Sequence, residues 1–194
     1  MDPLTVVDRA RALLGRTLIA HGVVLRITEV EAYAGVDDPA SHAYTRTPRS
    51  EIMYGEPWRL YVYRSYGMHL CANIVTGPRE QAAAVLLRAG EVVKGLDTAR
   101  ARRGPAVPDH ALARGPGNLA RALGITLDDL GSDVLAPGGV NLGPPGEEPA
   151  VIAAGPRVGV SRAADVPWRL WVAGDPTVSA YRRSPRAPVS EGST

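Results

Sequence analysis

Two glutamates and a tyrosine alternate in the first third of the chain, as Glu29, Glu31 and Tyr33. They end the run GVVLRITEVEAY at 22–33, whose β-branched and roughly alternating residues predict a strand. Alternate side chains of an extended chain point to the same face, so the two carboxylates and the phenol lie together. This face is either the solvent-exposed side of an edge strand, or it carries a general base beside an aromatic surface.

A second group of aromatic residues follows at Tyr61, Tyr63 and Tyr66. The chain has seven tyrosines, three tryptophans and no phenylalanine, so three tyrosines within six residues are a concentration. Residues 59–75 predict two strands joined by a hairpin near 64–67, with Tyr61 and Tyr63 on one face. Tyr66, at or beside the turn, either folds back onto the hairpin or inserts against a flat partner.

The remaining reactive residue types favour neither a metal nor a cofactor. The four histidines, including His42, have no metal-ligand spacing, and Cys71 is the single cysteine. Neither a P-loop nor a dinucleotide-binding glycine pattern occurs. We therefore expect a protein without a metal site and without a cofactor.

Charge is distributed unevenly along the chain. The formal net charge is +2, and Lys94 is the only lysine among 22 basic residues. Residues 43–103 carry ten basic groups against five acids, whereas 104–150 carry two against six. This asymmetry indicates either an ordinary solvated surface or a positive face for a polyanion, and arginine suits bidentate phosphate recognition.

Composition and patterning predict one mixed α/β domain at 1–182, with a loose tail at 183–194. Hydrophobic residues make up 45% of the chain, enough for a sizeable core. No apolar run approaches a membrane span of about 20 residues, and the first residues lack a signal-peptide pattern, so we expect a soluble, cytoplasmic protein. The expected elements are a curved, mainly antiparallel sheet with strands at 22–33, 59–75, 83–88, 149–154 and 168–172, flanked by helices at 2–15, 91–103 and 115–123, with long loops at 34–58 and 131–149.

A series of short segments, in order, resembles the alkyladenine (3-methyladenine) DNA glycosylase family over roughly residues 5–180. The segments are TEVEAY at 28–33, SHA at 41–43, RTPR at 46–49, LYVYRSYGM at 60–68, VLLRA at 85–89, GPGNL at 115–119 and GPRVGV at 155–160. The resemblance implies an alkyladenine DNA glycosylase-like fold and an enzyme that flips damaged purines out of duplex DNA. Such an enzyme hydrolyses the N-glycosidic bond and leaves an abasic site.

The resemblance also implies a role for each matching residue. Glu31 matches the general base that activates a water, Arg88 matches the arginine that holds this water, and the Val158 carbonyl matches a further ligand to it. The base pocket is implied at Tyr33, His42, Tyr63 and Asn73, and the DNA-intercalating wedge at Tyr66. The substrates implied are 3-methyladenine, 7-methylguanine, hypoxanthine and ethenoadenine in double-stranded DNA.

Two other functions compete with this interpretation. A non-enzymatic nucleic-acid or damage-binding module on the same fold would have no use for a carboxylate at Glu31, where DNA phosphates approach. A hydrolase for free nucleosides would need neither Tyr66 at a hairpin tip nor surplus arginines. Because Lys94 is the only side-chain amine and lies outside every matching segment, the resemblance favours a monofunctional glycosylase with a water nucleophile.

Overall fold

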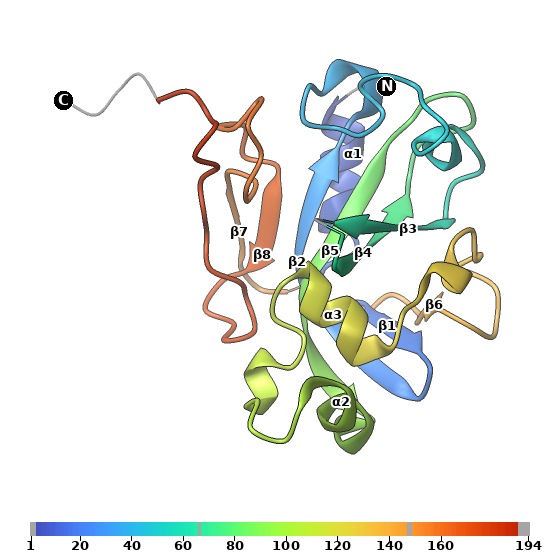
Figure 1. Ribbon diagram of the computed structural model, residues 1–194, viewed down its shortest axis with the longest axis vertical. Helices are drawn as coiled ribbons and strands as arrows, with labels where there is room; N and C mark the ends of the chain where they lie inside the picture. The colour runs from blue at the N-terminus through green and yellow to red at the C-terminus, as the bar shows by residue number, and fades with distance from the viewer. Residues whose placement is uncertain (1–2, 66, 147–148, 190–194) are drawn as a thin grey trace.

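A curled antiparallel sheet forms the centre of the molecule (Figure 1). The computed structural model describes residues 3–65, 67–146 and 149–189. The strands of this part are β1 (Thr17–Ala20), β2 (Val23–Tyr33), β3 (Leu60–Ser65), β4 (His69–Val75), β5 (Ala84–Lys94), β6 (Asn141–Leu142), β7 (Ile152–Gly155) and β8 (Arg169–Val172). Its helices are α1 (Pro3–Arg11), α2 (Leu96–Arg103) and α3 (Pro116–Leu123), with single 3-10 turns η1 (Gly35–Asp37), η2 (Glu51–Tyr54), η3 (Asp109–Ala111) and η4 (Leu127–Asp129).

The long strand β2 is the organising element of the sheet. The main strand order is β3-β4-β5-β2-β1-β6, and β8 also pairs with β2. One edge of β2 pairs with β5 along nearly its whole length, whereas the other edge pairs first with β1 and then, at 29–31, with β8. The early strand β2 and the late hairpin β7–β8 therefore lie together (Figure 1).

A paired irregularity in β2 and β5 changes which residues face the core. Register shifts on β2 fall between Ile27 and Glu29 and between Glu29 and Val30. Before the shift the core side chains of β2 are those at 23, 25 and 27; after it they are those at 30 and 32. Such bulges re-aim side chains. Glu29 and Glu31 therefore face away from the core, although Ile27 faces into it.

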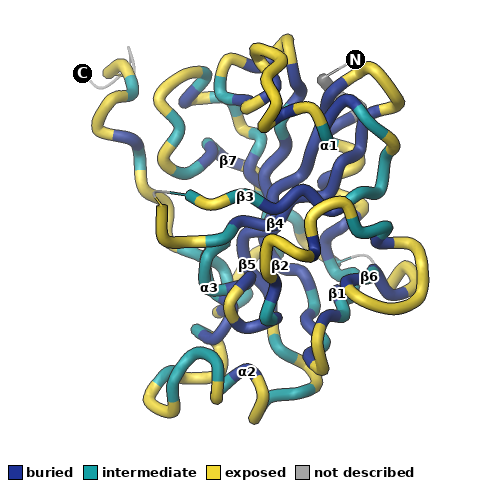
Figure 2. Tube along the Cα trace, turned by 45° about the vertical axis from the view of Figure 1, so that its right-hand side comes forward, coloured by how far each residue is buried: buried dark blue, intermediate teal, exposed yellow. Residues whose placement is uncertain are grey.

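The hydrophobic core lies on one side of β2 and β5, against α1 and α3 (Figure 2). Val30 and Leu87 are fully buried there. On the opposite side of the sheet, Glu31, Leu86 and Asn73 are register partners across β2, β5 and β4. Because directly opposite residues lie on the same face, these three side chains form one row across the curled sheet.

The structure confirms a single mixed α/β domain with a curled antiparallel sheet, as well as the hairpin at 59–75. Two expectations about the elements are wrong. The helix expected at 91–103 begins only at Leu96, because the β-branched pair Val92–Val93 extends β5 and Gly95 turns the chain with φ of 77°. The edge-strand interpretation of 22–33 is also wrong, since β2 is paired on both sides and Glu29 and Glu31 are 0% exposed.

Other sequence expectations lie partly outside the described residues. Tyr66 is not among them, so its proposed insertion stays a prediction. Of the tail at 183–194, residues 183–189 are described without a helix or strand, and Arg183 pairs with Asp165. The flexibility of this tail stays a prediction. No helix in the described ranges is long and apolar enough to cross a membrane.

Substitution of Gly90 tests the close packing of β2 on β5. A Cβ atom at Gly90 would overlap the Leu25 side chain and lie 2.5 Å from the Arg26 carbonyl oxygen. We expect Gly90→Ala to lower the free energy of unfolding by about 2 kcal/mol in urea denaturation, because the two strands must separate. Gly22→Ala is the control, since Gly22 has φ of 82° and open space around it, and should cost only about 1 kcal/mol. Equal losses would contradict this packing argument.

Candidate active site

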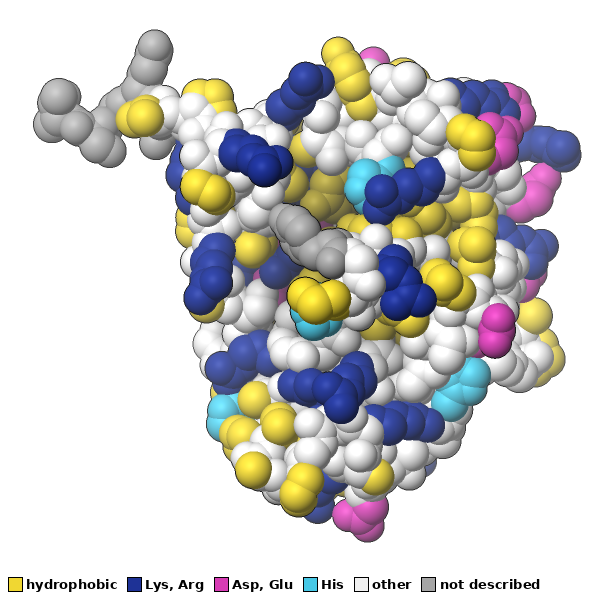
Figure 3. Space-filling model, viewed as in Figure 1, with side chains coloured by type: hydrophobic (Ala, Val, Ile, Leu, Met, Phe, Trp, Pro, Cys, Tyr) yellow, Lys and Arg dark blue, Asp and Glu magenta, His cyan; other side chains and the backbone are white. Residues whose placement is uncertain are grey.

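A pocket of about 1050 Å³ opens on the face of the sheet that carries Glu31. Seven of the eight residues predicted for the site line it: Glu31, Tyr33, His42, Tyr63, Asn73, Arg88 and Val158. They come from four strands and two loops, and the eighth, Tyr66, lies outside the described residues. Basic side chains lie around the hollow on this face, and acidic side chains lie mainly towards its edges (Figure 3); the basic residues that line the pocket include several arginines.

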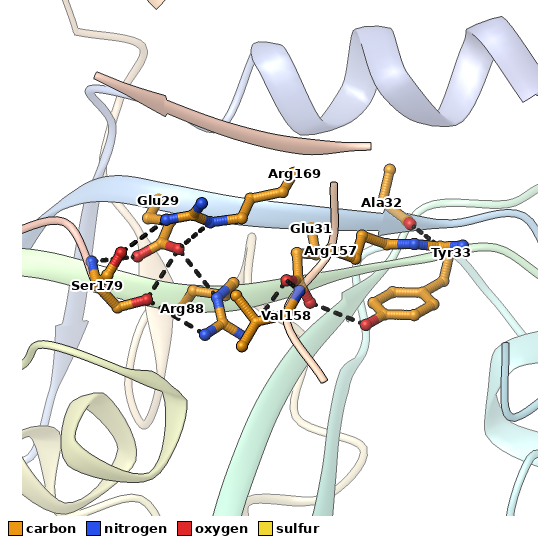
Figure 4. Close-up of polar contacts among 9 residues, drawn as sticks. All are labelled: Glu29, Glu31, Ala32, Tyr33, Arg88, Arg157, Val158, Arg169 and Ser179. Carbon is orange, nitrogen blue, oxygen red and sulfur yellow. Dashed lines mark hydrogen bonds and ion pairs between the residues drawn. The ribbon is translucent and has the colours of Figure 1, made fainter. Parts of the chain in front are cut away.

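The Glu31 carboxylate is held from three directions (Figure 4). Its Oε1 accepts the Val158 backbone N–H at 2.7 Å and lies 3.4 Å from Arg88 Nη1. Its Oε2 accepts the Tyr33 hydroxyl at 2.8 Å. A carboxylate oxygen can accept more than one hydrogen bond, so both oxygens keep capacity for a further donor. Glu31 is thus a buried anion with a fixed orientation in a large pocket.

The neighbouring carboxylate of Glu29 forms ion pairs with two arginines (Figure 4). Its Oε1 accepts Arg88 Nε at 3.0 Å and Arg169 Nε at 2.6 Å, and its Oε2 accepts the Ser179 backbone N–H at 2.7 Å. Arg88 therefore bridges Glu29 and Glu31. Burial alone would lower the pKa of Arg88, but the carboxylates of Glu31 and Glu29 raise it above its ordinary value. Arg88 is a permanent cation at this position.

A second buried ion pair fixes the side of the pocket next to Glu31. Arg157 donates from Nη2 to Asp38 Oδ1 at 2.9 Å and from Nη1 to the Ala32 carbonyl at 2.9 Å. Its guanidinium carbon lies 4.6 Å from the centre of the Tyr33 ring. Because Arg157 directly precedes Val158, the same contact orients both the ring and the backbone N–H that hold Glu31.

An aromatic wall faces this charged cluster. The rings of His42 and Tyr63 meet edge to face at 4.6 Å, and Tyr61 and Tyr63 lie 5.4 Å apart. His42 Nδ1 is 3.1 Å from the Tyr61 hydroxyl. The Asn73 Nδ2 donates to the Tyr61 backbone carbonyl at 3.0 Å, which fixes the orientation of the amide. A planar ring that enters the pocket can therefore pack against these aromatic side chains. The Glu31 carboxylate lines the same pocket.

The pKa values of the aromatic wall follow from burial. The pocket walls partly remove the His42 imidazole from water, although this residue is still exposed at the pocket, and this desolvation lowers its pKa to about 4; the nearby positive charge of Arg49 adds to the effect. Burial raises the pKa of Tyr63, as it does that of Tyr33, where the Glu31 carboxylate acts in the same direction. At neutral pH the wall therefore consists of an uncharged imidazole and protonated phenols.

Sequence reasoning missed several residues that shape the site. Arg157 and Asp38 are 119 positions apart, and nothing in their local sequence indicates a pair. Arg169 and Ser179 reach Glu29 from the last quarter of the chain. For Glu29 the sequence does contain a signal, which is its alternation with Glu31. Two acids on one face of a buried strand require nearby cations, so this alternation predicts ion pairs for both.

Comparison with known proteins places this site in a family. Residues 3–176 match the model of the family described as methylpurine-DNA glycosylase (MPG). Relatives named "Putative 3-methyladenine DNA glycosylase" include one from Mycobacterium sp. (strain KMS), 53% identical over 100% of this chain and 96% of its own. Another from Nocardia farcinica (strain IFM 10152) is 55% identical over 97% of this chain and 91% of its own. A third, from Mycobacterium tuberculosis (strain ATCC 25177 / H37Ra), is 51% identical over 97% and 94%.

The fold, the pocket and these matches define a DNA N-glycosylase, an enzyme that acts on bases in DNA. The chain belongs to the methylpurine-DNA glycosylase family.

Removing the charge of Glu29 tests its structural role. Glu29→Gln leaves Arg88 and Arg169 without their shared counter-charge in a buried place, so we expect the free energy of unfolding to fall by about 3 kcal/mol. Urea denaturation followed by circular dichroism measures it. The matched control is Glu91→Gln, which removes an exposed ion pair with Arg26 on the same two strands and should cost less than about 1 kcal/mol. A loss no larger than that of the control would show that the charge of Glu29 is dispensable.

The titration of His42 tests the electrostatics of the aromatic wall. His42 should titrate with a pKa of about 4 in heteronuclear NMR, because desolvation and Arg49 disfavour its protonated form. Arg49→Gln removes one positive charge and should raise this pKa. Arg46→Gln should not, since Arg46 lies in the same loop but is paired with Glu51 and Glu80 outside the pocket. Loss of the signal in His42→Gln assigns it, and a His42 titration between pH 6 and 7 in the unsubstituted protein would contradict the prediction.

Proposed function

We propose that the protein is a monofunctional glycosylase of base excision repair that acts as a monomer on damaged purines in double-stranded DNA. Its substrates are purines of the 3-methyladenine, 7-methylguanine, hypoxanthine and ethenoadenine class. The observation that carries the proposal is the Glu31 carboxylate, which is 0% exposed, oriented by three donors and located in the pocket opposite an aromatic wall. Unlike the buried carboxylates of Glu29 and Asp38, the carboxylate of Glu31 belongs to a residue that lines the pocket.

In the proposed reaction Glu31 is the general base. It takes a proton from a water molecule as the water oxygen attacks C1′ of the flipped nucleotide, and the bond between C1′ and the purine nitrogen breaks. The electron pair of that bond leaves with the base. A cationic alkylpurine departs as a neutral base, whereas a neutral purine departs as an anion and takes up, through solvent, the proton that Glu31 removed from the water. In both cases the deoxyribose keeps the water oxygen as the hydroxyl of an abasic site. Arg88 and the backbone carbonyl of Val158 hold the water against Glu31.

The flipped base occupies the space between Tyr33 and the wall of His42 and Tyr63. Stacking on aromatic rings is worth about 1–3 kcal/mol per base and offsets much of the cost of extrusion. Tyr66 fills the gap left in the duplex, and Asn73 obstructs the exocyclic amine of normal guanine. The fixed orientation of the Asn73 amide supports this last role, because a group held by the Tyr61 carbonyl cannot rotate away.

A water nucleophile agrees with the position of the only lysine. Enzymes that also cut the DNA strand attack the sugar with an amine. Lys94 ends β5, is exposed and is not among the residues that line the pocket. A damage-binding module without activity is the competing function, and the orientation of Glu31 by Tyr33, Val158 and Arg88 favours the enzyme over it.

Glu31→Gln should abolish base release. The substituted amide keeps the size of the side chain but cannot accept a proton, so we expect the single-turnover rate to fall by about 10³-fold or more. The measurement follows abasic sites in duplexes that each carry one 7-methylguanine, hypoxanthine, ethenoadenine or undamaged purine.

Binding of the lesion duplex by Glu31→Gln should be retained, which separates loss of chemistry from loss of recognition. Glu91→Gln, an exposed substitution outside the pocket, should release bases like the unsubstituted protein. If the unsubstituted protein binds lesions but releases none, the protein is a damage-binding module and the proposed activity is wrong.

A further inference from the structure

One arginine that lines the pocket, Arg49, lies on the aromatic wall. The Arg49 guanidinium carbon lies 4.8 Å from the centre of the Tyr63 ring, so it stacks on the aromatic wall. Its charge also acts on His42 and on the Tyr61 hydroxyl. No ion pair joins Arg49 to a carboxylate in the part of the chain that the structure describes.

The buried groups beneath the pocket are, by contrast, electrically balanced. Six charged side chains between 0% and 6% exposed are involved: Glu29, Glu31, Asp38, Arg88, Arg157 and Arg169. Three are anions and three are cations, and every one of them is ion-paired within the set. Their formal sum is zero. Arg49 therefore adds one uncompensated positive charge directly at the aromatic wall.

The neighbour Arg46 shows that this loop can neutralise an arginine. Arg46 pairs with Glu51 at 2.5 Å and with Glu80 at 2.8 Å, and it does not line the pocket. Arg49, three residues later, lines the pocket without such partners. The two arginines thus differ in their surroundings because of their position in the loop, although the residue type is the same.

We propose that Arg49 is a specificity-determining residue that shifts the enzyme from cationic towards neutral purine lesions. The inference rests on the proposed function, because it assigns the choice among lesions to the same pocket. A base stacked near Tyr63 lies within a few ångströms of the guanidinium. A positively charged alkylpurine is repelled there, whereas a neutral purine such as ethenoadenine is not.

The cation of Arg49 also competes for the surface that would favour a charged base. Aromatic faces attract cations, and a cationic base gains this attraction when it stacks. The face of Tyr63 is already in contact with Arg49. A charged base must displace the guanidinium or share the ring with it, so the usual advantage of the charged lesion is reduced.

The experiment compares single-turnover excision from two duplexes, one with 7-methylguanine as the cationic lesion and one with ethenoadenine as the neutral lesion. Arg49→Gln keeps a polar side chain but removes the charge. We expect it to raise the ratio of the 7-methylguanine rate to the ethenoadenine rate by about five- to tenfold, the scale of repulsion between two unit charges about 4 Å apart when water screens them fully. Arg49→Lys keeps the charge but loses the planar stack on Tyr63, so it separates the two effects; if charge sets the ratio, the ratio should stay unchanged within about twofold.

Arg46→Gln is the matched control, because it removes an arginine from the same loop outside the pocket and should leave the ratio unchanged. Equilibrium binding of both duplexes is also measured in the Glu31→Gln background, with and without Arg49→Gln. The charge effect should appear there as a shift in the ratio of the two Kd values. Binding thus tests the role of Arg49 even if no base is excised, so failure of the inference is distinct from failure of the proposed function.

A different role for Arg49 gives a different pattern. If Arg49 holds a DNA phosphate, Arg49→Gln will weaken binding of both duplexes equally and reduce the salt dependence of binding, with no change in the ratio. That result, or a ratio that moves equally in Arg46→Gln, would overturn the proposal. Thermal unfolding of each variant verifies that the exposed substitutions leave the fold intact.

Discussion

Burial of two carboxylates side by side is the constraint on which the rest of this structure depends. Glu29 and Glu31 leave water completely, and an isolated buried anion would be very unfavourable. Each is stabilised because donors converge on it, most of them from distant parts of the chain: Arg88 from β5, Arg169 from β8, and the backbone of Val158 and Ser179 from late loops. The last quarter of the chain is therefore held against β2 by ion pairs and hydrogen bonds as well as by the pairing of β8 with β2.

The bulge in β2 makes this arrangement possible. A strand without it would place Glu29 and Glu31 on the same face as Val23, Leu25 and Ile27, which is the hydrophobic core. The register of β2 against β5 shifts between Ile27 and Val30, beside Arg88 on β5. Across this shift the side chains of β2 exchange the core-facing side of the sheet for the pocket-facing side. The same local distortion thus removes two anions from the core and brings them to the arginine that bridges them.

Much of the fold could be predicted from the sequence because its signals are local. The alternation at 22–33 and the hairpin at 59–75 are read from neighbouring residues, and they correspond to β2, β3 and β4. The helix start was misplaced because Glu91–Lys94 suits either structure until pairing with β2 decides. Other features depend on contacts between remote segments, which the patterns of a single sequence do not contain. These features are the Arg157–Asp38 pair, the pairing of β8 with β2 and the position of Arg49 at the pocket.

The distribution of charge separates two demands on a protein that acts on DNA. Attraction of a polyanion requires a positive face, and arginines lie around the open side of the pocket (Figure 3). The general base that we propose, Glu31, must in contrast remain an anion close to this positive face. The buried arginines beneath the pocket are paired with Glu29, Glu31 and Asp38, so their charges are balanced there. The positive charge that could attract DNA is therefore carried by the arginines around the opening of the pocket. Arg49 lies on the aromatic wall at this pocket, so our proposal assigns to this wall the balance between attraction of DNA and selection of the base.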